Sequence, residues 1–413
     1  MKSIQAPIVA LAAAFTIATP VFADVVTDWN QFTLAAAKTA GQNSNLASRV
    51  NAIEAIAVYD AVNSILQFGD KYHYFAPPAG AASPEAAAAQ AAHDVLVNSF
   101  PAQQTDLDTK LAASLAPIAD GPDKTAGLAV GAAAAADIIA LRANDGSSPN
   151  VTYPGPASPG VGEWRPTPGP TPGSFPDGIN QQWGDVKPFV LKKAAPFGPP
   201  KPVPVGTKAY KKALAEVQSL GSATSATRTV EQTHIAQFFK QDAELTVNEA
   251  ARELSAAHDL TVAENAVLFA LVDIAVADAR IATWAGKYKY KYWRPVTALN
   301  ADADGVVRNG YTAWTPLIVT PAHPSYSSGH SATVNSGLEV LRVFFGDWNT
   351  VTLHTTTAGE PARSYRSLTQ IEIENGLSRI YGGIHFSFDN VQGQKVGNKV
   401  AAYVLKHGPG FSN

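Results

Sequence analysis

One helical segment constrains the fold more than any other part of the chain. It runs from Val262 to about Lys287 and contains NAVLFALVDIAVADARIATWAG, which is amphipathic at its start and then apolar on nearly every face. A helix that is apolar all round is buried on all sides in a folded protein. We therefore predict a core helix here.

Helical patterns also occupy most of the remaining chain. ASRVNAIEAIAVYDAVNSI (Ala47–Ile65) has helical spacing, and a second early segment is predicted to begin with Ser83 as N-cap and Pro84 at the first helical position. A third early segment ends near Asp145. No segment indicates a sheet and no repeat of fixed period occurs, so the fold class is all-α, in packed helical bundles. The later helices are predicted at Thr207–Leu220, Ala226–Lys240, Val247–His258, after Gly329, at Leu368–Tyr381 and from Ser387 to about Leu405.

A proline- and glycine-rich segment, residues 146–206, separates the two helical parts. Its centre reads PGPASPGVGEWRPTPGPTPGSFPDG, which cannot form a packed helix or strand. A solvated linker is one interpretation, but the segment carries four large aromatic residues that a tether would not need. We favour a long ordered loop laid over the helices, between a helical region at 24–145 and a second one at 207–413. The four aromatic residues are Trp164, Phe175, Trp183 and Phe189.

The composition indicates a globular chain without an extended charged surface. Of its 413 residues 46% are hydrophobic and 16% charged, and the formal net charge is -3. Nucleic acid and anionic membrane surfaces call for a basic field, which is missing here, so we expect no nucleic-acid partner. There is no cysteine, which excludes disulfides and thiolate-bound metals. Any anion-binding site must come from a local cluster of cations.

The first 23 residues have the pattern of a secretory signal. Lys2 precedes an apolar run from Ala6, and Val21 and Ala23 are the small residues before a cleavage site. An N-terminal anchor helix is the alternative, but the run is shorter than the ~20 residues that span a bilayer. We predict cleavage after Ala23 and export to the periplasm or the medium. No later segment of that length lacks charges, so we expect no membrane span.

The stretch KYKYKYWRP (Lys287–Pro295) allows two incompatible structures. Its alternation of Lys and Tyr fits a strand, in which Lys287 and Arg294 would point to opposite faces. On a helix, seven residues turn by about 700°, so the same two cations would lie within roughly 20° of one face. Pro295 disfavours helix at the residue before it. We predict that the core helix continues through much of this stretch and ends before Pro295, so that Lys287 and Arg294 share one ligand.

Two further stretches place polar residues at helix ends. AHPSYSSGHSATVNSG puts Ser328, Gly329 and His330 where a helix begins, and the unpaired N–H groups of a helix start, with its dipole, favour an oxyanion. LSRIYGGIHFSFDN ends one helix near Arg379 and presents His385 before the next. The glycine pair between them lets the chain reverse, so Arg379 and His385 can face one point.

Together these residues resemble the signature shared by the vanadium-dependent haloperoxidases and the type 2 phosphatidic acid phosphatase superfamily. The resemblance is strongest over residues 278–389, and DARIATWAGKYKYKYWRPVTAL with HPSYSSGHS is similar to the soluble haloperoxidase branch. WRPTP, QWGDVKPF and NAIEAIAVYDAVNSI resemble bacterial members of that branch. Ser327 stands where the family usually has proline, which removes a stiffening residue but no chemical group. The matching positions are Lys287, Arg294-Pro295, Ser328-Gly329-His330, Ser378-Arg379, His385 and Asp389.

The resemblance implies a site for vanadate, with phosphate as a competing occupant. Lys287, Arg294 and Arg379 would hold the oxyanion, because three cations that converge in a buried pocket repel one another unless an anion joins them. The Ser328 hydroxyl and the Gly329 N–H would complete the cradle.

The resemblance also assigns catalytic roles. His385 would be the vanadium ligand in a haloperoxidase, or the residue that attacks phosphorus in a phosphatase. His330 would be the acid or base, and Lys287 would polarise the bound peroxide. Asp389 and Asp278 look like residues that orient this site, although a capping or surface carboxylate fits both positions equally well.

These roles predict a vanadium-dependent haloperoxidase that oxidises a halide with hydrogen peroxide and thereby halogenates a small organic substrate. His323, seven residues before His330, favours bromide by resemblance to the algal enzymes. The alternative is a soluble acid phosphatase acting on a phosphomonoester through a phospho-histidine, but such phosphatases are shorter and lack the Lys-aromatic run before Arg294. A non-catalytic oxyanion-binding protein would not need both histidines. The sequence leaves the oligomeric state open.

Overall fold

The structure is a computed structural model that describes residues 24–411, so the predicted signal peptide at 1–23 lies outside the described residues. Within this range the chain forms thirteen α-helices and two small antiparallel sheets, which confirms the all-α prediction. One sheet pairs β1 (Gly69–Asp70) with β4 (Gly410–Phe411), and the other pairs β2 (Val351–Leu353) with β3 (Arg363–Tyr365).

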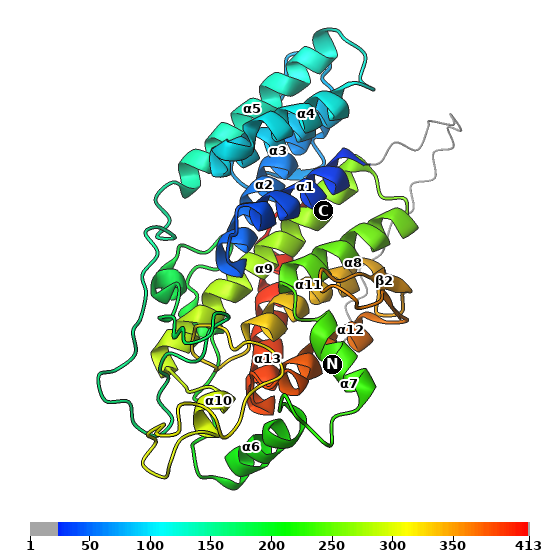
Figure 1. The fold of residues 1–413 in the computed structure, drawn as a ribbon. Helices are drawn as coiled ribbons and strands as arrows, with labels where there is room; N and C mark the ends of the chain where they lie inside the picture. The colour runs from blue at the N-terminus through cyan, green and yellow to red at the C-terminus, as the bar shows by residue number, and fades with distance from the viewer. Residues whose placement is uncertain (1–23, 412–413) are drawn as a thin grey trace, which may run out of the picture.

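Helix α9 (Val262–Tyr290) is the core helix that the sequence predicts. Thr261 is its N-cap and forms a capping box with Glu264. The Thr261 hydroxyl accepts from the Glu264 N–H, and the Glu264 carboxylate accepts from the Thr261 N–H. All residues from Asn265 to Trp284 are buried, because α2, α11 and α13 pack around the helix and α1 and α8 add further contacts. Figure 1 shows α9 passing through the middle of the molecule between the N-terminal and C-terminal helices.

Five helices precede the long loop and form the blue and cyan end of the molecule in Figure 1. The Ser83 hydroxyl accepts from the Ala86 N–H and Pro84 is the first helical residue of its helix, as predicted. The sequence reasoning did not identify the first and fourth of these helices. Helix α5 passes the length and hydropathy criteria for crossing a membrane, but in the structure it packs on α3 and α2. The five are α1 (Val25–Thr39), α2 (Ser44–Leu66), α3 (Pro84–Ser99), α4 (Gln104–Leu115) and α5 (Pro122–Arg142).

The helices after the loop match the predicted ones closely. Helices α11 and α13 pack against each other and against α9, which brings the residues that follow Gly329 beside those that follow His385. The short helix after Arg294 was not predicted. Around α9 these helices are α6 (Lys208–Leu220), α7 (Val230–Phe238), α8 (Ala243–Ala257), α10 (Pro295–Ala298), α11 (Gly329–Phe345), α12 (Leu368–Tyr381) and α13 (Ser387–His407).

The proline- and glycine-rich segment is an ordered loop that lies on the helices, as predicted. Trp164, Trp183 and Phe189 are buried, whereas Phe175 is 46% exposed. The loop backbone touches α9 directly, since a Cβ added to Gly184 would lie 2.5 Å from the Ala285 Cα. The loop includes two 3-10 turns, Gln181–Asp185 and Ala195–Phe197. The proposed division of the chain at residues 145 and 206 stays a prediction.

Candidate active site

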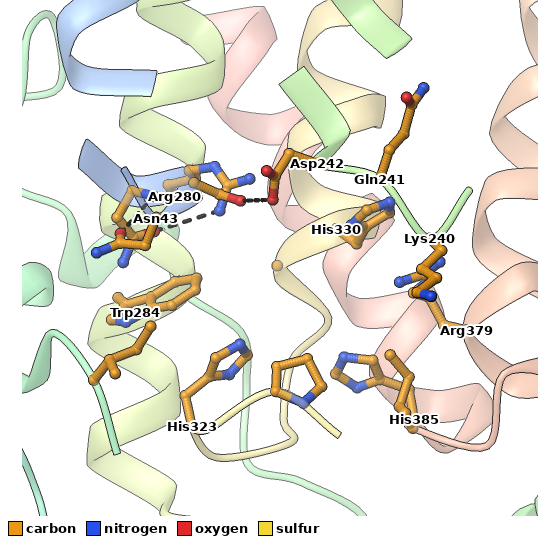
Figure 2. A pocket seen from close by; sticks show the side chains of 16 residues that line it. Asn43, Lys240, Gln241, Asp242, Arg280, Trp284, His323, His330, Arg379 and His385 are labelled. Carbon is orange, nitrogen blue, oxygen red and sulfur yellow. Dashed lines mark hydrogen bonds between the residues drawn. The ribbon is translucent and has the colours of Figure 1, made fainter. Parts of the chain in front are cut away.

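A cavity of about 260 Å³ lies where the start of α11, the end of α12 and the middle of α9 meet. Figure 2 shows His323 and His385 on one side of it, His330 and Arg379 beside His385, and Arg280 and Trp284 on the α9 side. Ten residues were predicted from the sequence to belong to the site, and five of them line this cavity. These five are His323, Gly329, His330, Arg379 and His385. The remaining five, which do not line it, are Asp278, Lys287, Arg294, Ser328 and Asp389.

The start of α11 supplies Gly329 and His330. Ser328 is the N-cap, and its hydroxyl accepts from the Ser331 N–H at 3.2 Å and from the Ser331 hydroxyl at 2.9 Å. Gly329 packs on an aromatic ring, since a Cβ at this position would lie 2.9 Å from Cζ3 of Trp284. Only glycine therefore lets α11 begin this close to α9. In this arrangement the Ser328 hydroxyl caps the helix and does not line the cavity.

His330 is a half-buried histidine in the wall of the cavity. Its Nε2 is buried without a protein partner. Burial, followed by the nearby guanidinium groups of Arg379 and Arg280, holds the pKa of His330 well below its usual range. Near neutral pH the ring is therefore neutral, which leaves a ring nitrogen able to accept a proton from a bound ligand.

His385 follows the turn at Gly383, whose φ of +80° favours glycine. The His385 Nδ1 lies 2.9 Å from Oδ2 of Asp389, which also accepts the Ser325 hydroxyl. Burial raises the pKa of Asp389 to about 6, against the lowering effect of Ser325 and Lys287. Burial and the charges of Arg294 and Lys287 hold the pKa of His385 well below its usual range. Asp389 thus orients the ring, and Nε2 on the other side accepts a hydrogen bond from Arg294 NH1 at 3.1 Å, which a ligated atom would replace.

The KYKYKYWRP stretch is helical through Tyr290, as predicted. Lys291 ends α9 in a left-handed conformation with φ of 46°, and Arg294 is extended at the start of α10. Lys287 Nζ donates to the carbonyls of Pro324 and Ser325, at 2.8 and 2.9 Å. Its pKa is lowered well below the usual range, first by burial and then by Arg294.

Arg294 binds the same turn as Lys287 from the other end. Its guanidinium donates to the carbonyls of Pro321 and His323 at 3.3 and 2.9 Å, and to His323 Nδ1 at 3.0 Å. NH1 lies 3.1 Å from Nε2 of His385. Burial lowers the pKa of Arg294 to about 9. The shared partner of Lys287 and Arg294 is therefore the turn at residues 321–325, which presents its carbonyls to both cations.

Arg379 is the predicted cation that lines the cavity itself. Its Nε donates to the Ser378 hydroxyl at 3.0 Å, and NH2 donates to the Phe239 carbonyl. Burial, and then Arg294, lower the pKa of Arg379 to about 9. None of the hydrogen bonds described for this side chain goes to a carboxylate, so its positive charge is unmatched.

Asp278 differs from its predicted role. Its carboxylate accepts hydrogen bonds from the backbone N–H groups of Phe189, Val190 and Leu191, at 2.7, 2.9 and 2.9 Å. It therefore fixes the long loop on α9 and does not orient a histidine of the cavity. A carboxylate in the middle of an apolar helix is the only sequence signal of this contact, and it does not reveal the partner.

Other residues of the cavity wall escaped the sequence reasoning. Arg280 is seven residues before Lys287 and thus on the same face of α9, and its guanidinium donates to Glu244 Oε2 at 2.7 Å. His323, predicted near the site, packs its ring 4.8 Å from that of Trp284. The starts of α2 and α8 also reach the wall through Asn43, Ser44, Asn45 and Asp242, beside Lys240 and Gln241 from the α7–α8 turn.

Comparisons with known proteins agree with the resemblance in the motifs. Residues 267–411 match the family model of the VCPO second helical-bundle domain. The vanadium chloroperoxidase of Curvularia inaequalis is 26% identical over 174 residues, which are 31% of this chain and 28% of that protein. The alignment thus spans less than a third of the curated relative.

Solved structures show the same fold over nearly the whole chain. A bacterial vanadium-dependent iodoperoxidase superposes with a TM-score of 0.79 and 23% identity, covering 94% of this chain and 98% of the other. A bacterial vanadium-dependent chloroperoxidase in its holo form gives 0.70 at 19% identity, covering 94% of each chain. The resemblance read from the motifs is confirmed: this chain has the fold of the bacterial vanadium-dependent haloperoxidases, and its residues 267–411 match the model of the VCPO second helical-bundle domain.

Proposed function

We propose that this chain is a vanadium-dependent haloperoxidase that uses hydrogen peroxide to oxidise a halide. The observation that carries the proposal is the buried set of cations around His385. Lys287, Arg294 and Arg379 are all at most 4% exposed, and Asp389 is the buried carboxylate among them. At an effective dielectric near 20, each cation attracts a unit negative charge at 4 Å by roughly 4 kcal/mol. An oxyanion with negative charge relieves the mutual repulsion of the three.

The residues present fit vanadate. His385 offers a neutral ring nitrogen that Asp389 orients, which is the geometry expected of a histidine that ligates a metal. Arg379 and the Gly329 N–H, at the start of α11, lie in the cavity wall where they can donate to oxygen atoms. When bound, vanadate supplies a Lewis-acidic centre that activates hydrogen peroxide toward a halide.

The protein's own groups handle the protons of the reaction. Oxidation of a halide by hydrogen peroxide consumes one proton and yields hypohalous acid and water. His330, whose depressed pKa keeps the ring neutral, takes a proton from peroxide as the peroxide enters. Lys287 and Arg294 hold the turn that carries His323 and supply positive charge on the far side of His385. The small organic substrate is then halogenated by the hypohalous acid.

Bromide is our proposed halide. His323 lies in the cavity wall against the Trp284 ring, and its Nδ1 accepts from Arg294. His323 is thus held beside Arg294. A histidine seven residues before His330 is the feature of the algal enzymes on which the preference for bromide is based. Parallel assays with chloride, bromide and iodide test the preference, and equal rates with chloride and bromide would contradict it.

Export is a separate proposal that rests on residues 1–23, outside the described structure. Expression of the full chain followed by cell fractionation and N-terminal sequencing tests it. A mature protein that begins at Asp24 in the periplasm or medium supports cleavage after Ala23. An uncleaved chain in the cytoplasm contradicts it.

The decisive assay for the function incubates the purified protein with orthovanadate, hydrogen peroxide and bromide and follows bromination of an indicator dye. A parallel assay without peroxide follows hydrolysis of a chromogenic phosphomonoester. Vanadate-dependent bromination that inorganic phosphate inhibits is expected, because both anions need the same donors. Hydrolysis without bromination would instead show the acid phosphatase alternative.

A further inference from the structure

A second cavity, of about 460 Å³, shares no lining residue with the candidate active site. Its walls come from β1 and the residues after it, the end of α5, the long loop, and the end of α13 with the residues that follow. This volume lies in the range of sites for small organic molecules. The lining includes one carboxylate, that of Asp70, and five basic side chains, which belong to Lys71, His73, Arg142, Lys187 and His407.

Hydrogen bonds hold the walls of this second cavity in place. The Tyr72 hydroxyl donates to the Phe189 carbonyl at 2.8 Å, which ties the segment after β1 to the long loop. The Arg142 guanidinium donates to the carbonyls of Pro188 and Lys187 at 3.2 and 2.5 Å, and it lies 3.9 Å from the centre of the Phe189 ring. A ligand therefore finds a preformed cavity and does not have to order its walls.

Two of the five basic side chains already have acidic partners. Arg142 pairs with Asp145 at 2.9 Å, and His73 pairs with Asp137. A third carboxylate of this region, that of Asp60, accepts the backbone N–H groups of residues 72–74. These three carboxylates are engaged with other groups, so they leave the remaining basic side chains without a paired carboxylate.

The remaining basic groups are the amines of Lys71 and Lys187 and the ring of His407. In the part of the chain that the structure describes, none of the three makes a hydrogen bond or an ion pair through its side chain. Asp70 offsets one of the two lysine charges, so the lining keeps a net positive charge. The three groups come from different parts of the fold, and the cavity is wider than one carboxylate or phosphate group. An anion with several carboxylates can therefore pair with more than one of them at once.

We propose that the second cavity binds a small organic polycarboxylate, whose carboxylates pair with Lys71 and Lys187 and accept a hydrogen bond from His407. This inference does not rest on the proposed function, since the two cavities share no residue. Both lysines are exposed, so solvent and salt weaken each ion pair and the affinity falls as ionic strength rises. Inorganic phosphate concentrates its charge at one point, pairs with fewer of these groups and binds here more weakly.

Calorimetry with citrate on the purified protein tests the proposal. In a buffer of low ionic strength we expect saturable binding of citrate, and weaker binding when sodium chloride is added. Arg379→Gln removes a cation of the candidate active site and should bind citrate within about twofold of wild type. A loss of citrate binding in Arg379→Gln would place the citrate in the active-site cavity and overturn the proposal.

The double variant Lys71→Gln/Lys187→Gln removes both unpaired amines and replaces them with polar side chains that carry no charge. Citrate binding should weaken roughly tenfold, because each exposed ion pair contributes modestly to the affinity. The matched control is Lys192→Gln/Lys193→Gln, which makes the same change of charge at two exposed lysines of the long loop that do not line the cavity. The control should bind citrate within about twofold of wild type.

Thermal unfolding of each variant shows whether it is folded before citrate is added. If the double variant is unstable, Lys71→Gln and Lys187→Gln are titrated singly, and each should weaken citrate binding by roughly threefold. The proposal is overturned if wild type shows no saturable binding of citrate, if the double variant binds as tightly as wild type, or if the control loses as much affinity. Bromination activity enters none of these outcomes, so a failure of the proposed function leaves them unchanged.

Discussion

Two buried polar regions share helix α9 but differ in how their charges are matched. One is the cavity with His330, Arg379 and His385. The other, the α8–α9 seam, is a row of polar side chains inside the core. Its members are Glu244, Asn248 and Ser255 on α8, and Asn265, Asp273 and Arg280 on α9.

The side chains of the seam pair with one another across the two helices, and only Glu244 Oε1 and Arg280 Nε among their atoms stay unpaired. Ser255 donates to Asn265 at 2.6 Å, Asn248 donates to Asp273 at 2.9 Å, and Arg280 donates to Glu244 at 2.7 Å. Each contact joins the two helices, and the α9 members recur every seven or eight residues along one face. Such a row specifies how α8 sits on α9, because a slip would leave buried polar groups unpaired.

The cavity, in contrast, leaves the Arg379 guanidinium without an opposite charge. His330 Nε2 has no partner, and Arg379 donates only to a hydroxyl and a carbonyl. Burial alone is common to both regions, so burial does not distinguish a site from a structural network. What distinguishes them is whether each cation meets a carboxylate within the protein: Arg280 pairs with Glu244, whereas Arg379 donates only to neutral groups.

Replacement of His385 by alanine should have the largest effect. The proposed function loses its ligand atom, and bromination should fall by roughly a thousandfold or more. Stopped assays with orthovanadate measure the rate. His407→Ala changes an exposed histidine outside the cavity and should retain full activity, and a loss of activity there would show that the assay reports general damage.

Inorganic phosphate or vanadate should stabilise the protein against unfolding. A ligand at about 100 times its Kd adds about 2.7 kcal/mol to the free energy of unfolding, since it binds only the folded state. Thermal unfolding with and without phosphate measures the gain. Arg379→Gln should lose most of it, whereas Ser255→Ala in the seam should lower the starting stability and keep the gain. An equal gain in all three proteins would place the anion elsewhere.

Asp273→Asn should make stability less dependent on pH. Burial raises the pKa of Asp273 to about 7, against the lowering contact with Asn248. The folded pKa thus lies above the unfolded one, so this carboxyl favours folding at low pH and the favourable contribution is lost as pH rises through about 7. Between pH 5 and 8 the variant should lose less stability than wild type, by on the order of 2 kcal/mol. Urea titrations at both pH values measure the difference.

Glu231→Gln should have the smallest effect. Glu231 pairs with Arg363 at the surface, where its side chain is 62% exposed. Solvent and salt screen such pairs, so the free energy of unfolding should change by less than about 1 kcal/mol. A larger loss in urea titrations would show that surface ion pairs contribute as much to the free energy of unfolding as the buried pairs of the α8–α9 seam.

The sequence predicted those parts of the fold and site that depend on local pattern. The cap at Ser83, the apolar run of α9 and the glycine turn before His385 are each encoded within a few residues. Helix α4 was missed because its exposed surface gives no apolar face, with Leu107 its one buried residue.

The remaining features of the site depend on contacts between distant residues. No local pattern tells that Asp278 holds the loop at Phe189, that Gln241 reaches Thr356, or that the start of α2 joins the cavity wall. Lys287 and Arg294 were predicted to share one anion as their ligand. In the structure both donate to carbonyls of the turn at residues 321–325, which no local pattern identifies as their partner.

The close packing of the long loop on α9 bears on how the chain resists degradation. A Cβ on Gly286 would lie 2.6 Å from the Pro199 ring, so the loop packs directly on the helix at this point. The loop cannot move away from α9 without breaking this contact. A segment with this composition is usually where proteases cut first. Here the peptide bonds near Trp164 and Trp183 should survive native digestion, and cleavage should begin instead near the exposed Phe175.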